Sequence, residues 1–188
     1  MIIETERLVI RKIKESDFDD FCEFVIDEEM CRMMGRDNIT DAETARFTFD
    51  WLKDREEHGC VLELKENGKV IGNLTVTPVP EYMSGNPELK GRNGRGMSFS
   101  LSRHYQRRGL MYEAVSAVID HLFYEEDVEF INNGYFDFNI PSRELHKKLG
   151  FTVLLTDKIE INGEEITAVE TALWRNENGD KRIHERMR

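Results

Sequence analysis

A short segment in the middle of the chain, residues 106–111, has the composition of an anion-binding loop. Together with Arg103 it carries three positive charges and no negative one, whereas the whole chain has a formal net charge of -11. Free backbone N–H groups at a helix start, the positive end of the helix dipole and arginine side chains all favour an anion. Gly109 has no side chain to keep a ligand away from the backbone. The segment is therefore predicted to bind phosphate.

The residues on either side predict a strand that leads into this loop and a helix that follows it. Residues 95–102 alternate apolar side chains with serines, the pattern of a strand with one buried face. Residues 109–125 repeat apolar side chains at the spacing of one helix face. The loop would thus present the first N–H groups of the helix to the ligand.

The order of the other elements predicts the fold class. Asn67 and Gly68 separate two β-rich runs and indicate an antiparallel hairpin. The strand at 95–102, the helix at 109–125 and a strand at 130–136 imply a right-handed crossover between parallel strands. Further strands are expected at residues 8–13, 151–155 and 166–174, the last two joined by a turn at Asn162. We expect an α+β fold with a mixed, mostly antiparallel sheet of about seven strands, one parallel crossover, and helices on both faces.

Three further helices are indicated by their end signals. Ser16 and Thr40 are each followed three residues later by an acid, as in a capping box, and the second helix is expected to reach about residue 57. Pro141 suits the first turn of a helix that Gly150 would end.

Length and composition bound the protein class. We expect one domain over residues 1–175 and a polar tail over 176–188. No apolar run approaches a membrane span and no signal-peptide pattern opens the chain, so a cytoplasmic protein without membrane contact is expected, as monomer or homodimer. The excess of 37 acidic over 26 basic side chains repels nucleic acid. Three cysteines without ligand spacing predict reduced thiols and no metal.

From residue 4 to about residue 174 the chain resembles the GNAT N-acetyltransferase superfamily, on two motifs. Gln106-x-x-Gly109-x-Met111 is similar to the family's QxxGx(G/A) loop, which binds the pyrophosphate of acetyl-CoA. Residues 139–151 resemble its NxxSxxLxxKxGF segment. The opening at residues 5–11 further resembles the branch that acetylates the amino termini of ribosomal proteins.

The resemblance implies that acetyl-CoA donates its acetyl group to an amine, without a metal. The pantetheine arm would bond to the strand end and the pyrophosphate to the loop N–H groups, while Ser142 and His146 would face the thioester. The residues expected to bind the cofactor are Leu101, Ser102, Gln106, Arg107, Arg108, Gly109, Leu110, Met111, Asn139 and Ser142. Ser142 and His146 are the expected catalytic residues. The residues themselves also allow Asn139 to be a helix cap and His146 a surface histidine.

Three positions depart from the family pattern. Met111 stands where a small residue is usual, and His146 where many relatives have a tyrosine that protonates the thiolate. Gly96, Ser98 and Ser100 occupy the strand where many relatives carry a glutamate base. Removal of the amine proton through water by Glu63, Glu81 or Asp137 therefore stays open.

The missing strand acid favours an acceptor that loses its proton easily. At pH 7 an α-amine with a pKa near ~8 costs about 1.4 kcal/mol to deprotonate, against about 4.6 for a lysine-type amine. We expect the α-amino group of a peptide terminus or a small metabolite. An aminoglycoside- or polyamine-type amine, a non-catalytic acyl-CoA sensing domain and an unrelated phosphate-binding protein remain as alternatives.

Overall fold

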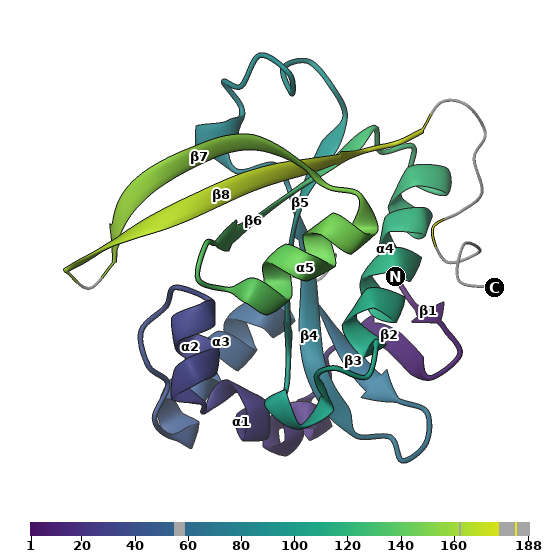
Figure 1. Ribbon diagram of the computed structural model, residues 1–188. Helices are drawn as coiled ribbons and strands as arrows, with labels where there is room; N and C mark the ends of the chain where they lie inside the picture. Colours follow the sequence, from purple (N-terminus) through teal and green to yellow (C-terminus); the bar gives the residue numbers. More distant parts are fainter. Residues whose placement is uncertain (55–58, 162, 177–182, 184–188) are drawn as a thin grey trace. The chain divides into compact units, whose positions relative to one another are not determined.

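A computed structural model describes residues 1–54, 59–161, 163–176 and 183, and it confirms the expected fold class (Figure 1). Its strands are β1 (Ile3–Glu4), β2 (Leu8–Lys12), β3 (Gly59–Leu64), β4 (Val70–Thr77), β5 (Gly94–Leu101), β6 (Phe130–Phe136), β7 (Thr152–Ile161) and β8 (Glu164–Trp174). Its α-helices are α1 (Phe18–Val25), α2 (Glu28–Met33), α3 (Ala42–Asp54), α4 (Leu110–Tyr124) and α5 (Ile140–Leu149). Short 3-10 segments are η1 (Glu15–Asp17), η2 (Glu81–Met83) and η3 (Arg103–Tyr105).

The described strands form one mixed sheet in the order β1-β2-β3-β4-β5-β6-β8-β7. β5 and β6 pair in parallel from Gly94 opposite Phe130, with α4 between them in sequence, as the crossover prediction requires. The pairs β1–β2, β2–β3, β3–β4, β6–β8 and β7–β8 are antiparallel. β1 was not predicted, because a strand of two residues has no periodicity to detect.

By its internal contacts the chain divides into two compact units. The first comprises residues 1–76 and 98–114, and the second comprises residues 77–97 and 115–188. The single-domain prediction stays a prediction. Of the polar tail predicted from residue 176, the structure describes only Asn176 and Ile183.

In the first unit, α1 and α3 share an apolar core with β3 and β4. Phe21 packs edge-on against Phe24 and Phe49, with ring centroids 5.2 and 5.3 Å apart, and all three are buried. The predicted hairpin forms, with Gly68 at a φ of +74° in its turn. Figure 1 shows α1, α2 and α3 grouped together at one end of this unit.

In the second unit, β7 and β8 form a long antiparallel hairpin whose other partner is β6 (Figure 1). β7 extends to Ile161, well beyond the predicted end at Leu155. Most of its residues are exposed on both faces, so the alternation that marks a strand in sequence is missing. Asn162 of the predicted turn lies outside the described residues.

Both predicted capping boxes were wrong in detail. Ahead of α1 the carboxylate of Asp17, not of Asp19, closes the turn by accepting from the N–H of Lys14 at 2.7 Å. Ahead of α3 the side chain of Asp41, not of Thr40, accepts from the N–H of Thr44 at 2.8 Å. An Asp beside a Ser or Thr competes for the same N–H groups, and sequence alone does not decide between them. The predicted helix end near residue 57 lies outside the described residues.

None of the helices in the described part of the chain is both long and apolar enough to cross a bilayer.

Candidate active site

The backbone between η3 and α4 has the conformation of an anion-binding loop. Arg107 has a φ of +64° and Gly109 a φ of +80°, so two left-handed residues stand just before the first residue of α4. Alternation of right- and left-handed residues turns successive N–H groups toward one concavity. The first N–H groups of an α-helix have no partner within the helix. The residues present at 107–111 therefore fit a pyrophosphate group.

Contacts with neighbouring segments of the first unit hold this loop in place. The side-chain amide of Gln106 donates to the carbonyl of Leu101 at 3.0 Å, which ties the loop to the end of β5. Arg7, from the turn between β1 and β2, donates to the carbonyl of Arg108 at 2.9 Å. Arg7 was missed as a site residue, since nothing in its spacing relates it to a loop about a hundred residues away. The side chain of Gln106, which was predicted to bind the cofactor, thus binds the backbone of the protein.

Glu113, on the first turn of α4, completes this support. Its carboxylate accepts from the backbone N–H of Arg7 at 2.8 Å, from the Arg7 guanidinium at 2.7 Å and from the Thr5 hydroxyl at 2.5 Å. Burial alone would raise the pKa of Glu113, but the hydrogen bonds from Thr5 and Arg7 outweigh it and lower that pKa. An ionised Glu113 also suits the positive end of the helix dipole.

The three arginines of the predicted basic segment have different surroundings. Arg103 forms an ion pair with Asp27 at 2.7 Å, so that charge is largely neutralised. The guanidinium of Arg108 stacks over the ring of Tyr105 at 5.2 Å. The side chains of Arg107 and Arg108 are exposed and stay available to a phosphate.

The remaining first-unit residues of the prediction lie at the end of β5 and in the first turn of α4. Leu101, Ser102 and Leu110 are buried. The N–H of Ser102 donates to the carbonyl of Ile71 at 2.8 Å, and its carbonyl accepts from the N–H of Tyr105 at 2.9 Å. Met111 is half-buried in the first turn of α4, so the wider side chain at this position is accommodated beside the loop.

The other predicted residues lie at the start of α5, in the second unit. Asn139 caps the helix, because its side-chain oxygen accepts from the N–H of Ser142 at 3.1 Å. The cap interpretation of Asn139 is therefore confirmed. Ser142 is half-buried on the first turn.

His146 is a core residue, so its interpretation as a surface histidine is wrong. Its side chain is 2% exposed and lies between the rings of Tyr135 and Phe151, at centroid distances of 5.0 and 4.9 Å. Nδ1 lies 2.7 Å from the carbonyl of Ser142 and must carry the proton that this oxygen accepts. Burial lowers the pKa of His146, against the opposing effect of that hydrogen bond. The ring is thus neutral at pH 7, and its Nδ1–H group donates a hydrogen bond to the Ser142 carbonyl.

A neutral ring whose proton lies on Nδ1 is a poor proton donor through Nε2. The Ser142 hydroxyl lies 3.4 Å from Nδ1 of His146, on the same helix. The two predicted catalytic residues therefore lie together on α5, with His146 hydrogen-bonded to the Ser142 carbonyl.

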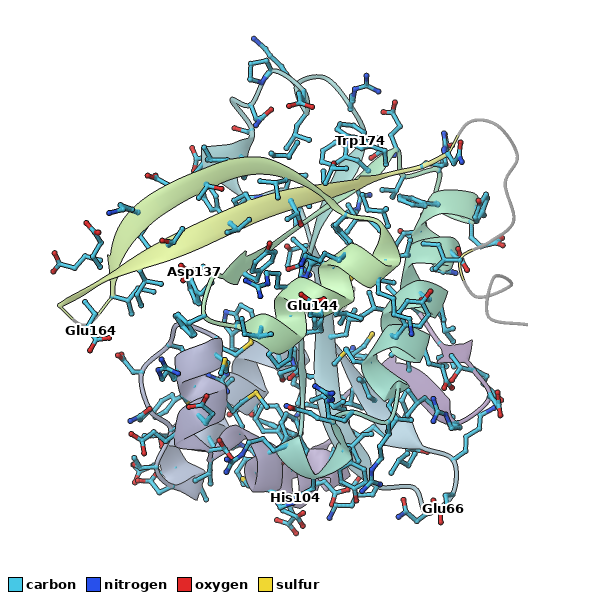
Figure 2. The ribbon with its side chains drawn as sticks, in the orientation of Figure 1. Glu66, His104, Asp137, Glu144, Glu164 and Trp174 are labelled. Carbon is cyan, nitrogen blue, oxygen red and sulfur yellow. The ribbon has the colours of Figure 1, made fainter. Side chains whose placement is uncertain are left out.

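The candidate bases also differ. Glu63 on β3 is held by Arg11, with a shortest contact of 2.5 Å, and Arg11 also pairs with Asp17. The Glu63 carboxylate is thus engaged in an ion pair within the first unit. Glu81 lies in η2 and Asp137 follows the end of β6, where Figure 2 labels it, both in the second unit.

A cavity of about 170 Å³ lies within the first unit. Ser98 of β5 and Asn73 and Thr75 of β4 form one part of its wall. The hydroxyls of Ser98 and Thr75 are 2.6 Å apart, so Ser98, one of the three residues noted on the strand that lacks an acid, is hydrogen-bonded across the two strands. The rest of the wall comes from Phe21, Met34, Arg36, Thr48, Trp51 and Leu52. No carboxylate belongs to this lining, as far as the described residues go.

Comparisons with known proteins agree with this fold. Residues 7–152 match the family model described as Acetyltransferase (GNAT) domain. The chain is 27% identical over 180 residues to the uncharacterized N-acetyltransferase p20 of Bacillus licheniformis, covering 92% of this chain and 96% of that protein.

Two solved structures illustrate the structural likeness. The ribosomal-protein-S5-alanine acetyltransferase from Vibrio fischeri has a TM-score of 0.74 at 20% identity and covers 96% of this chain and 100% of its own. Mycobacterium smegmatis RimJ, solved in complex with CoA-disulfide, has a TM-score of 0.73 at 16% identity and covers 96% of this chain and 88% of its own. At these identities the structures establish the fold alone. The family model matches most of the sequence, residues 7–152, and therefore establishes the family. The chain belongs to the GNAT acetyltransferase family.

Proposed function

We propose that this N-acetyltransferase moves the acetyl group of acetyl-CoA to an α-amino group, of a peptide or protein terminus or of a small metabolite. GNAT enzymes use acetyl-CoA as the acetyl donor. One solved neighbour is a ribosomal-protein-S5-alanine acetyltransferase, and alanine has no side-chain amine, so that name agrees with an α-amino group as acceptor.

The proposal assigns the cofactor to the loop and strand of the first unit. The N–H groups of residues 107–111 hold the pyrophosphate, with Arg107 and Arg108 adding positive charge. The strand end at Leu101 and Ser102 orients the pantetheine arm as an added strand would be oriented. A main-chain N–H of β5 hydrogen-bonds the acetyl carbonyl oxygen as charge develops on it. When bound, the cofactor supplies the activated thioester.

At the start of α5, Asn139 is proposed to position Ser142, and Ser142 is proposed to be the proton donor. Asn139 fixes the first turn by accepting from the N–H of Ser142, which aims the Ser142 side chain. The Ser142 hydroxyl would relay to the departing thiolate the proton that the attacking amine loses as the amide forms, so the serine is left unchanged. His146 holds the same turn by donating a hydrogen bond from Nδ1 to the Ser142 carbonyl.

One observation carries the preference for an α-amine: no carboxylate among the described residues lines the cavity beside β5. Ser98 and Thr75 stand there, and their hydroxyls bond to each other. Because an α-amine loses its proton about 3 kcal/mol more easily than a lysine-type amine, a site without a base on this strand suits it better.

The test is release of the free CoA thiol over a panel of acceptors at pH 7. The panel contains peptides with a free amino terminus, amino acids, an aminoglycoside, a polyamine and amino-terminally blocked lysine peptides. We expect the highest kcat/KM among the α-amines. Faster turnover of the lysine, polyamine or aminoglycoside amines than of every α-amine would contradict the proposal.

A further inference from the structure

Arg36 is fixed at the wall of the cavity by the end of α2. Gly35 has a φ of +62°, and its N–H donates to the carbonyl of Arg32 at 3.1 Å. The N–H of Arg36 donates to the carbonyl of Cys31, also at 3.1 Å. These two bonds are the Schellman motif, which sets the direction of the chain after a helix. The backbone of Arg36 is therefore held firmly, and its side chain lines the cavity.

The guanidinium of Arg36 has no acidic partner among the residues that the structure describes. Its Nε is buried and makes no hydrogen bond there. Other arginines of the first unit are paired: Arg11 with Asp17, and Arg103 with Asp27. A guanidinium keeps its charge at any physiological pH and presents donors in a planar fork that matches a carboxylate. Within the described part of the chain, the cavity thus contains a positive group that no acidic side chain neutralises.

The rest of the cavity suits a small amphipathic group. Phe21, Met34, Trp51 and Leu52 provide apolar surface. The cavity volume of about 170 Å³ gives room for a group the size of an amino-acid side chain.

The same cavity is lined by Ser98 of β5, the strand that the proposed function places beside the thioester. One cavity therefore joins the position of the attacking amine to Arg36. The net charge of -11 disfavours anions in general, but an amine that also carries one carboxylate is neutral overall.

We propose that the preferred acceptor carries a carboxylate, which Arg36 binds by a bidentate pair while the apolar wall contacts the intervening carbon atoms. This inference rests on the proposed function and narrows its substrate class to amino-carboxylic acids. The carboxylate has two possible sources: a free amino acid, or an acidic side chain at the first position of a peptide.

The experiment compares acceptors with and without this carboxylate, by steady-state release of the CoA thiol. One arm pairs free amino acids with their amides, and the other pairs peptides that begin with Asp or Glu with those that begin with Asn or Gln. We expect one arm to show a kcat/KM at least about tenfold higher for the acid, the size of a charge-assisted hydrogen-bond pair. The arm that shows it identifies the source.

Variants test whether Arg36 is responsible. Arg36→Gln should raise the KM of the acid acceptor about tenfold or more, leave the KM of its amide and of acetyl-CoA within about twofold, and be partly rescued by Arg36→Lys. Arg32→Gln is the matched control, because it removes a charge from α2 itself at an exposed position outside the cavity lining. It should change none of these constants.

The wild-type comparison decides the matter even if Arg36→Gln fails to fold. Acid and amide acceptors of equal kcat/KM in both arms would overturn the inference, as would an equal response of both acceptors to Arg36→Gln. If α-amines are acetylated without regard to the carboxylate, only this inference fails. If lysine or polyamine amines react faster than all α-amines, or no amine reacts, the proposed function fails with it.

Discussion

At the scale of single residues, burial decides the difference between Ser142 and His146. Their spacing of four along a helix is visible in the sequence, and it predicts correctly that they lie on one face of α5. The sequence does not show which of the two side chains is buried by neighbouring residues. The rings of Tyr135 and Phe151 enclose His146, whereas Ser142 stays half-buried.

This difference predicts separate effects of mutation. Ser142→Ala should lower kcat about tenfold or more while the KM of acetyl-CoA changes little, because a proton donor acts on the chemical step. Ser142→Thr keeps the hydroxyl and should retain most of the activity. Steady-state kinetics checks both. An unaltered kcat in Ser142→Ala would remove this residue from the mechanism.

For His146, the lowered pKa predicts that the stability of the protein depends on pH. Its pKa in the folded protein is lowered below 6.5, so the unfolded chain binds this proton first as the pH falls. The free energy of unfolding should therefore decrease as the pH drops below about 6.5, until the folded-state pKa is reached. Denaturant melts between pH 7.5 and 5 should show this slope, and His146→Gln should flatten it.

His104 provides the control for this measurement. It is an exposed histidine on η3, labelled in Figure 2, and His104→Gln should leave the slope unchanged. The same slope in wild type and His146→Gln would show that His146 is not the titrating group.

At the scale of elements, the loop before α4 was the most predictable part of the site. Its glycine, its arginines and the hydrophobic period that follows are all local in sequence, and each has a local structural effect. The contacts that hold it are not local: Arg7 and Thr5 reach Glu113 across more than a hundred residues. At the starts of α1 and α3 the sequence predicted a helix correctly, but it did not predict which side chain caps that helix.

The left-handed conformation at Gly109 gives a prediction for this element. Gly109→Val adds a side chain to a residue with a φ of +80° and blocks approach to the helix start, so the KM of acetyl-CoA should rise about tenfold or more. Gly68→Val is the matched control. Gly68 has a similar φ of +74°, open space around its Cβ position and no role in the loop. It should lose stability but keep its KM for acetyl-CoA; an equal rise in both variants would mean that general strain, not the loop, is responsible.

At the scale of the whole molecule, the order of elements was enough to predict a mixed sheet with one parallel crossover, and two motifs were enough to predict the family. The family match removes two alternatives left open by the sequence, a non-catalytic sensing domain and an unrelated phosphate-binding protein. The cavity could not be predicted. Its wall combines side chains from α1, α3, β4, β5 and the end of α2, and no spacing in the sequence relates them.

The proposed function requires that the N–H groups of residues 107–111 bind the pyrophosphate of the acetyl donor. Backbone amide shifts in NMR spectra test it most directly, by titration with CoA and, in parallel, with pantetheine, which lacks the diphosphate. The account predicts that CoA shifts the amide signals of Arg107, Arg108, Gly109 and Leu110 strongly and that pantetheine leaves them nearly unchanged. Amide signals that stay in place while CoA binds elsewhere would contradict it.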